Sequence, residues 1–392
     1  MKLDAIVIGA GPAGSTAALL LARAGWSVVI VEKSAFPRRK VCGEFISAPA
    51  LGLLADIGLG DDVLALAGPD VREVAVYAGE RVVAAEMPRH ERDRYGRAIG
   101  REHLDTLLLS AAARTGAVVW QPWRVDRWTR ADGGFVCTMT NKERARVDLR
   151  APVLIAAHGS WDTGRLAVSR AASDLLAFKA HFSGCSLPPH RMPLVAFPGG
   201  YGGLVTTDGG RVSFSCCIRR SVLAQCRAEA PRATAGAAVL AHVLSSTLGA
   251  REALGAAVRD GGWLAAGPLR PGIGSACGSG YFSIGNAHAE AHPIVAEGIS
   301  MAIQSASMLC ERLVAAGSGA DVRWLDGVAR EYEAAYRSSF RQRIGAAAAF
   351  AALAMRPRAA AGVASLLEEL PALLTLGARW AGKAANYNSV MV

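Results

Sequence analysis

Short apolar runs and one helical stretch alternate along the first thirty residues of the chain. Residues 3–8 and 27–31 are short and almost wholly apolar, which is typical of strands buried on both faces of a parallel sheet. Between them, residues 15–24 are rich in Ala and Leu and end at Gly25, which predicts a helix with a glycine stop. The order strand, helix, strand predicts one βαβ unit at the N-terminus.

Two further kinds of pattern follow this unit. Apolar positions that alternate or form short runs predict strands over residues 71–87, 117–120, 122–149, 153–157, 176–218 and 281–284. Helical patterns occupy residues 50–59, 101–114, 221–259 and most of 300–385. Strands that alternate with helices predict an α/β protein, here with a β-rich insertion and a helical C-terminal tail.

Composition narrows the class of protein. The 392 residues, 52% of them hydrophobic, are enough for two or three domains. The eight cysteines form no C-x-x-C pair, so no metal site is expected, and no secretory leader is recognisable; both features predict a cytoplasmic protein with reduced thiols. No apolar stretch reaches the roughly 20 residues that a transmembrane helix needs.

The net charge of +10 admits several interpretations. The simplest is a solvated, arginine-rich surface. An anionic cofactor, an acyl-carrier partner or an anionic membrane surface would also suit a basic chain. The sequence contains no nucleic-acid-binding motif, so no nucleic-acid partner is expected.

A glycine motif lies where the first strand meets the first helix. Residues 9–14 read GAGPAG, which matches G-x-G-x-x-G, and Glu32 ends the second strand. In this context Gly9 permits the tight turn, Gly11 lets the backbone approach a pyrophosphate and Gly14 lets the helix pack on the strand. The helix N-terminus favours phosphates, and the carboxylate of Glu32 can accept hydrogen bonds from a ribose. We expect a dinucleotide here, bound by Gly9, Gly11, Pro12, Ala13, Gly14, Glu32 and Lys33.

The segment after the second strand indicates which dinucleotide. Residues 4–33, followed by PRRKVCGE at 37–44, resemble the start of the FAD-dependent oxidoreductase superfamily that contains para-hydroxybenzoate hydroxylase and geranylgeranyl reductase. The resemblance extends to about residue 310. It implies a Rossmann-type, glutathione-reductase-like FAD domain of the hydroxylase type, with Cys42 and Gly43 near the flavin ring.

Further segments support this resemblance. Arg101, in IGREHLDTL at 99–107, is similar to the family's arginine that contacts the cofactor. Residues 153–160 take the place of an Asp-Gly motif, with His158 and Gly159 there. FPGGYGG at 197–203 resembles a substrate-domain strand. The stretch from 284 to 299 is similar to the second flavin motif, which implies cofactor contacts by Asn286, Pro293, Gly298 and Ile299.

Three departures from the family pattern concern the cofactor site. Asn286 replaces the Asp that holds the ribityl chain, Ala296 replaces a glycine, and His158 replaces the Asp of the Asp-Gly motif. The last change puts the ordinary use of NADH or NADPH in doubt. These nucleotides are expected at most as transient electron donors, with a partner reductase as the alternative source.

Candidate reactive residues lie near the expected flavin. Cys42 could tune the ring or gate the substrate, although a free cysteine is often only a small buried apolar residue. His288 and His292 precede the flavin-facing helix and could exchange protons near neutral pH. Tyr201 and Glu44 are expected to line the substrate cavity.

The predicted organisation is discontinuous. The FAD-binding domain comprises residues 1–70, 97–175 and 270–315. An inserted β-sheet substrate domain comprises 71–96 and 176–269, and residues 316–392 form the C-terminal helical region. The sequence allows peripheral membrane contact by this last region but does not decide it.

The reaction is predicted by analogy alone. The first interpretation is an FAD-dependent monooxygenase that hydroxylates an aromatic, polyketide-like or lipidic molecule, since the superfamily is rich in hydroxylases. Alternatives are a reductase of alkenes like geranylgeranyl reductase, a flavin-dependent halogenase and a non-enzymatic electron-transfer flavoprotein. The W-x-W-x-I-P signature of tryptophan halogenases is absent from the sequence.

Overall fold

The computed structural model describes most of the chain. The described ranges are residues 2–90, 94–160, 170–274, 277–319 and 321–383. The final part of the predicted C-terminal region, residues 384–392, lies outside them.

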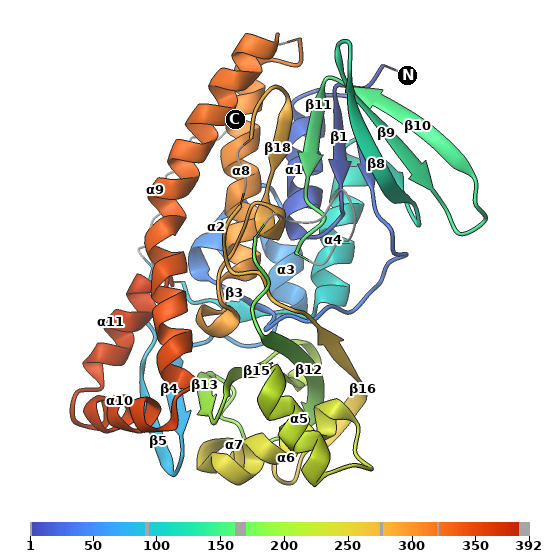
Figure 1. The fold of residues 1–392 in the computed structure, drawn as a ribbon. Helices are drawn as coiled ribbons and strands as arrows, with labels where there is room; N and C mark the ends of the chain where they lie inside the picture. Colours follow the sequence, from blue (N-terminus) through green and yellow to red (C-terminus); the bar gives the residue numbers. More distant parts are fainter. Residues whose placement is uncertain (1, 91–93, 161–169, 275–276, 320, 384–392) are drawn as a thin grey trace.

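A parallel five-stranded sheet forms the upper half of the molecule (Figure 1). Its order is β18 (Tyr281–Ser283), β11 (Val153–Ala156), β1 (Ala5–Ile8), β2 (Val28–Val31) and β7 (Val118–Trp120). The register sets Ala5 beside both Val28 and Val153, so β1 is the central strand. Both neighbours of β1 run parallel to it, which places the turn after β1 at the carboxyl edge of the sheet.

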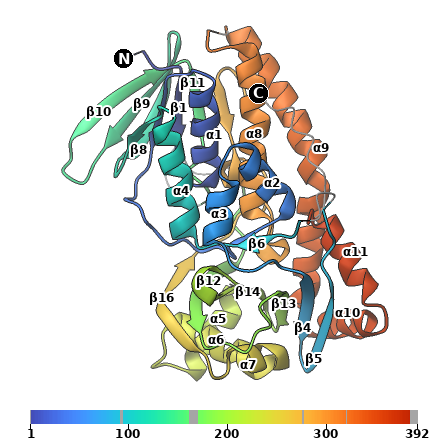
Figure 2. The same ribbon diagram turned by 180° about the vertical axis from the view of Figure 1, so that it is seen from behind.

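Both faces of this sheet are covered, which explains why its central strands are apolar throughout. One face packs on three helices, which lie together in Figure 2: α1 (Pro12–Arg23), α4 (Arg101–Arg114) and α8 (Gly298–Ala316). The other face packs on an antiparallel meander of β8 (Arg124–Ala131), β9 (Gly134–Thr140) and β10 (Arg146–Ala151). Successive residues of β1 therefore enter two different cores.

A seven-stranded, mainly antiparallel sheet forms the lower half. Its order is β16 (Val258–Ala266), β12 (Leu175–Ser183), β15 (Val212–Arg219), β14 (Gly200–Thr206), β13 (Arg191–Phe197), β4 (Glu73–Ala78) and β5 (Arg81–Glu86). Its outer face packs on α5 (Arg220–Glu229), α6 (Ala235–Ser246) and α7 (Leu248–Leu254). The helical pattern predicted over residues 221–259 forms these three helices, because the chain breaks again at Thr247, which is extended, and the last two residues of that range already belong to β16.

Shorter elements complete the fold. They are β3 (Phe45–Ile46), α2 (Ala48–Asp56), α3 (Gly60–Leu66), β6 (Arg97–Ala98), β17 (Gly272–Ile273) and β19 (Ala289–Glu290), with 3-10 turns at Asp208–Gly210, Gly285–Ala287 and Pro293–Val295. Two of them, α2 and α3, pack in the core of the upper half.

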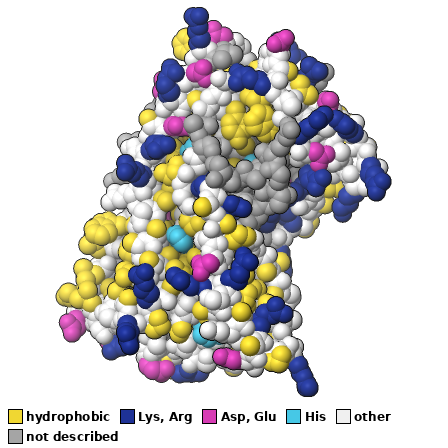
Figure 3. All heavy atoms as spheres, viewed as in Figure 1, with side chains coloured by type: hydrophobic (Ala, Val, Ile, Leu, Met, Phe, Trp, Pro, Cys, Tyr) yellow, Lys and Arg dark blue, Asp and Glu magenta, His cyan; other side chains and the backbone are white. Residues whose placement is uncertain are grey.

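The C-terminal helices run from the upper half down to the inner face of the lower sheet (Figure 1). The long α9 (Val322–Ala354) is followed by α10 (Pro357–Glu369) and α11 (Ala372–Trp380), which pack against β4 and β5. Within the described residues no single helix is long and apolar enough to cross a membrane; α10 and α11 pass that test only as a pair bent by 117°. Apolar side chains lie along this edge of the molecule, at the left of Figure 3.

The predicted α/β class is confirmed, with a Rossmann-like parallel sheet, a second sheet and C-terminal helices. One boundary differs in an informative way. The first helix begins at Pro12, three residues earlier than predicted, because Gly11 is its N-cap and proline suits the first helical position.

Candidate active site

A cavity of about 480 Å³ lies where the two sheets meet. It brings together almost all of the residues predicted for the cofactor: Gly9, Gly11, Pro12, Ala13, Glu32, Lys33, Cys42, Gly43, Arg101, His158, Gly159, Asn286, Pro293, Gly298 and Ile299. Glu44, Tyr201 and His292 also line it. Gly14 and His288 are not among its lining residues.

The glycine turn is built by close backbone contact. Gly9 has φ of +99°, which favours glycine, and a Cβ on Gly14 would lie 1.9 Å from the carbonyl oxygen of Gly9. Gly14 is therefore a packing residue beneath the turn. No side chain caps the N-terminus of α1 among the described residues. Its first N–H groups face the cavity and can bind an anion.

Glu32 lies against this turn at the end of β2. Its Oε2 accepts a hydrogen bond from the backbone N–H of Ala10 at 2.9 Å, and its Oε1 accepts one from Ser34 N–H at 2.9 Å. These bonds fix the carboxylate at the rim of the cavity. It retains lone pairs with which it can accept hydrogen bonds from ribose hydroxyls.

Arg101 stands on the other side of the turn. Its guanidinium forms a bidentate ion pair with Asp105, at 2.7 and 2.8 Å, and a Cβ on Gly11 would lie 3.7 Å from its Nη2. Arg38 lies 3.3 Å from Asp105 and 3.4 Å from Glu32. Burial acts to lower the pKa of Arg101, but the charge of Asp105 outweighs burial and the pKa is raised. Two cations are thus held beside the place where phosphates are expected.

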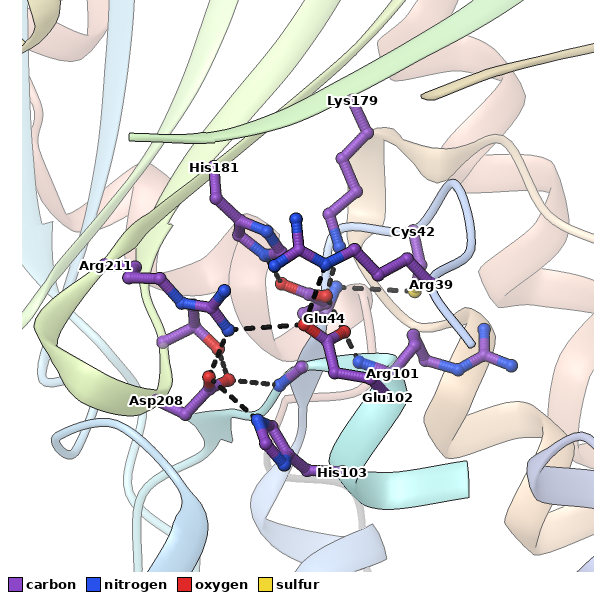
Figure 4. Close-up of polar contacts among 12 residues, drawn as sticks. Arg39, Cys42, Glu44, Arg101, Glu102, His103, Lys179, His181, Asp208 and Arg211 are labelled. Atoms are coloured by element: carbon purple, nitrogen blue, oxygen red, sulfur yellow. Dashed lines mark hydrogen bonds and ion pairs between the residues drawn. The ribbon is translucent and has the colours of Figure 1, made fainter. Parts of the chain in front are cut away.

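The Cys42-Gly43-Glu44 turn connects the two halves (Figure 4). Glu44 has φ of +65° and is fully buried. Its Oε1 accepts a hydrogen bond from Lys179 Nζ, and its Oε2 lies 2.8 Å from Nε2 of His181; both partners are on β12. Burial acts to raise the pKa of Glu44, but the His181 hydrogen bond and the Lys179 charge together lower it to about 2. The carboxylate is therefore ionised and pins the turn to the lower sheet.

A second polar cluster continues from Glu44 along the interface in Figure 4. Asp208 accepts a hydrogen bond from Gly100 N–H at 2.6 Å and forms an ion pair with Arg211. Arg211 also reaches Glu102 at 3.4 Å, on the first turn of α4. Hydrogen bonds and ion pairs thus fasten the start of α4 to the lower sheet.

The loop before α8 forms the opposite wall. Ala296 adopts a left-handed conformation (φ +50°, ψ +42°), which is a conformation that favours glycine. Lys383, from the end of the chain, donates hydrogen bonds to the carbonyl oxygens of Val295 at 2.7 Å and Ala296 at 3.3 Å, and to Glu297 Oε1 at 2.8 Å. The carbonyl oxygen of Asn286 accepts a bond from Arg170 at 2.7 Å.

Tyr201 and His292 form a polar pair in this region. The Tyr201 hydroxyl lies 3.1 Å from Nδ1 of His292. Burial raises the pKa of Tyr201 well above its usual value and lowers that of His292. Both groups are therefore neutral at pH 7 and able to exchange a proton with a bound molecule.

His288 has a different environment. It is buried, its Nδ1 lies 2.9 Å from Ser283 Oγ, and its ring packs on Tyr332 and Tyr336. Burial and nearby arginines lower the pKa of His288 to about 4. It packs within the core beneath the loop, away from the cavity.

The part of the cavity wall formed by the lower sheet and the C-terminal helices is largely apolar. The lower sheet contributes side chains such as Val74, Val76, Ala177, Met192, Leu194 and Leu204. The C-terminal helices contribute Phe350, Leu353, Ala354, Ala360, Val363, Leu367, Leu373, Leu374, Ala378 and Ala381. Such a wall suits an apolar substrate, with Tyr201 and His292 among the few groups that can orient it.

Sequence reasoning missed Lys179, His181, Lys383 and the helical wall. A signal for the first two exists in β12, where even-numbered residues such as Phe178 and Phe182 enter the apolar core under α5–α7. The odd-numbered positions lie on the opposite face of β12, and two of them carry charge-bearing groups in a strand whose other residues from Leu175 to Phe182 are apolar. No local pattern marks Lys383.

The residues present fit FAD. Two helix N-termini, those of α1 and α8, open on the same cavity, and neither has a side-chain cap among the described residues. Glu32 lies beside the first of them, and Arg101 stands across the turn. The first helix would hold a diphosphate and the second the electron-rich end of a flavin.

Comparisons with known proteins agree with this fit. Residues 2–182 match the family model described as FAD binding domain. Menaquinone reductase of Mycobacterium tuberculosis is 36% identical over 114 residues, which are 29% of this chain and 28% of that protein. Kynurenine 3-monooxygenase of Stenotrophomonas maltophilia is 31% identical over 196 residues, 47% of this chain and 42% of that protein. These matches span less than half of the relatives' length.

A solved structure extends the likeness to the whole fold. The flavin-dependent brominase Bmp2 superposes with a TM-score of 0.77 over 100% of this chain and 96% of its own, at 19% identity. The likeness therefore includes the second sheet and the C-terminal helices.

Proposed function

We propose that this chain, an FAD-dependent oxidoreductase whose residues 2–182 match the FAD binding domain model, hydroxylates an apolar, ring-containing small molecule. The supporting observation is the Tyr201–His292 pair, which lies in the same cavity as the apolar side chains of the lower sheet and the C-terminal helices. Bound FAD would supply the redox chemistry, transferring electrons from a donor to O₂. The chain's own residues would bind, orient and deprotonate the substrate.

The roles of the pair follow from its protonation. A phenolic ring becomes a better nucleophile when its hydroxyl proton moves to a base. His292 is neutral and half-buried, so it can accept that proton, and Tyr201 can relay it or fix the orientation of the hydroxyl. The apolar walls exclude water from the ring.

The overall reaction balances with one reduced nicotinamide. Substrate–H, O₂, NAD(P)H and a proton give substrate–OH, water and NAD(P)⁺. The nicotinamide could act directly at the cavity or through a partner reductase; an acyl-carrier partner remains a further proposal. We also propose a cytoplasmic location, with which the eight free cysteines agree.

A panel of para-alkylphenols of increasing chain length tests this proposal. We expect a matching phenol to stimulate NAD(P)H oxidation and to gain one atom from ¹⁸O₂ by mass spectrometry. Substituting His292→Ala or Tyr201→Phe is expected to lower kcat by roughly 10²-fold while FAD content stays unchanged. Because protonated His292 cannot accept a proton, the rate should also fall with pH below its lowered pKa.

The second candidate is reduction of a carbon–carbon double bond. The matches to menaquinone reductase and to digeranylgeranylglycerophospholipid reductase favour a reductase in general, and the same pair could then donate a proton to the substrate. A product that forms without oxygen and contains no ¹⁸O would replace the hydroxylase proposal with this one. A product that forms only with bromide or chloride would indicate a halogenase. An electron-transfer protein would show flavin reduction and no product.

A further inference from the structure

Large apolar side chains are exposed mainly on one side of the C-terminal helices. Six residues between the end of α9 and the end of α11 are 39–57% exposed: Leu353, Leu366, Leu370, Leu373, Leu376 and Trp380. We call these six residues the apolar face. In the rest of the described chain, exposed large apolar residues are spread over other elements: Leu64, Leu66, Val258, Trp324 and Val82, the last on β5 against which α10 and α11 pack. Figure 3 shows apolar side chains gathered along this edge.

Two residues of the apolar face also belong to the wall of the cavity. Leu353 and Leu373 are each 39% exposed, yet both also line the cavity. Behind them, Val363, Leu367 and Leu374 continue the wall inwards. A molecule entering between these side chains would pass from an apolar surface into an apolar interior. Along this whole path an apolar molecule contacts apolar side chains, which is more favourable than contact with water.

Basic residues border the apolar face. Arg356 and Arg358 lie at the start of α10, Arg379 lies in the last turn of α11, and all three are exposed. Two acidic residues end α10: Glu368, which pairs with Arg81 at 2.9 Å, and the exposed Glu369. The whole chain carries a net charge of +10. Exposed arginines beside apolar side chains complement an anionic lipid surface, where the arginines meet headgroups and the apolar groups enter the acyl boundary.

We propose that the apolar face docks on an anionic phospholipid bilayer, so that an apolar substrate enters the cavity from the lipid. The pair α10–α11 is bent by 117°, which suits helices lying in the interface. Trp380 stands beside Arg379 at the end of this pair, a position suited to the headgroup level. The docking deepens the proposed function because it names a lipid-soluble substrate class.

Flotation of the full-length holoprotein with vesicles tests the proposal. Vesicles of phosphatidylcholine mixed with phosphatidylglycerol are compared with vesicles of phosphatidylcholine alone. The wild-type protein should float with the anionic vesicles and bind the neutral ones more weakly, and added salt should reduce the difference. The triple variant Leu366→Ser/Leu370→Ser/Trp380→Ser should lose at least about tenfold in apparent affinity, since three inserted side chains are removed.

The matched control is Val258→Ser/Trp324→Ser, which removes two exposed apolar side chains elsewhere. It should bind within about twofold of wild type, because a residue outside the contact does not affect docking. The triple variant alters no residue that lines the cavity, so FAD content and Tm should report whether it is folded.

Three outcomes would overturn the docking proposal. Wild-type protein could fail to float with either vesicle. The triple variant could float as well as wild type. Light scattering could show that the wild-type protein is a dimer and the triple variant a monomer. The apolar face would then be the interface with a second copy of the chain. The assay contains no substrate, so a docking protein that hydroxylates nothing would overturn only the proposed reaction.

Discussion

A buried carboxylate must be matched by nearby cations, and Glu44 shows how one residue can join two halves of a protein. Its side chain receives Lys179 and His181 from a strand 135 residues away, while its backbone sits in a left-handed turn beside Cys42. The sequence predicted that Glu44 would line the cavity. It did not predict the partners, because their contact depends on how the second sheet packs against the first.

Substituting Glu44→Gln should destabilise the protein strongly. The change leaves the ammonium of Lys179 buried without its counter-ion, and breaking one side of such a pair typically costs about 3 kcal/mol or more. Urea unfolding of both proteins at pH 7 measures the loss. Glu80→Gln is the control, since Glu80 is an exposed partner of Arg251 and should change the free energy of unfolding by less than about 0.5 kcal/mol.

The pH dependence of this difference has a definite sign. The folded pKa of Glu44 is about 2, below its usual value of 4.5, so its ionised form stabilises the folded state above about pH 4.5. As pH falls from 4.5 towards 2 the contribution is lost. The gap between wild type and Glu44→Gln should therefore narrow in that window, and a gap that widened there would contradict this account.

At the scale of single elements, the N-terminal βαβ unit is the part that sequence predicts best. Its strands, its helix and its glycine turn are neighbours in the chain, so local pattern and backbone sterics suffice to define them. The C-terminal elements show the limit. An Ala- and Leu-rich pattern predicted helices there. The sheet that these helices cover could not be predicted, because the strands that they pack against are far away in the sequence.

Helix α1 yields a direct test of the glycine turn. Substituting Gly14→Ala places a methyl 1.9 Å from the carbonyl oxygen of Gly9, so the helix must move off the strand or the turn must open. Either shift displaces the N–H groups expected to hold FAD. We predict at least about a tenfold rise in the Kd for FAD, measured by fluorescence titration of the apoprotein.

Gly52→Ala is the matched control for this substitution. It lies in helix α2, and nothing lies within 4 Å of its added methyl. It should leave the Kd for FAD unchanged and stabilise its own helix slightly. An equal rise in the Kd for FAD in both variants would show that the displaced glycine turn is not the cause of the weaker binding.

At the scale of the whole molecule, the end of the chain completes a site begun at its start. The C-terminal helices supply one wall of the cavity, and Lys383 holds the loop before α8 by three hydrogen bonds. The ammonium also lies 4.2 Å from the ring centre of Phe45. A prediction from sequence separates this tail from the cofactor domain; the structure joins them at the loop that faces the cavity.

Substituting Lys383→Met should loosen that loop. Carbonyl oxygens of Val295 and Ala296 lose a buried charged donor, a change worth about 3 kcal/mol. We expect a lower Tm and faster release of FAD, followed by the rise in flavin fluorescence. Lys142→Met, which replaces an exposed lysine, is the control and should leave both quantities unchanged. An unchanged rate of FAD release in Lys383→Met would contradict the role of Lys383 in holding the loop.

The tie between Lys383 and the loop also orders events during synthesis. The Rossmann unit leaves the ribosome first and can fold early, but the loop that faces its cavity waits for a partner 88 residues further along the chain. A chain that ends before Lys383 therefore has the glycine turn, but the loop before α8 is not yet held in place. Tight retention of the cofactor thus marks chains that have been made at least as far as Lys383.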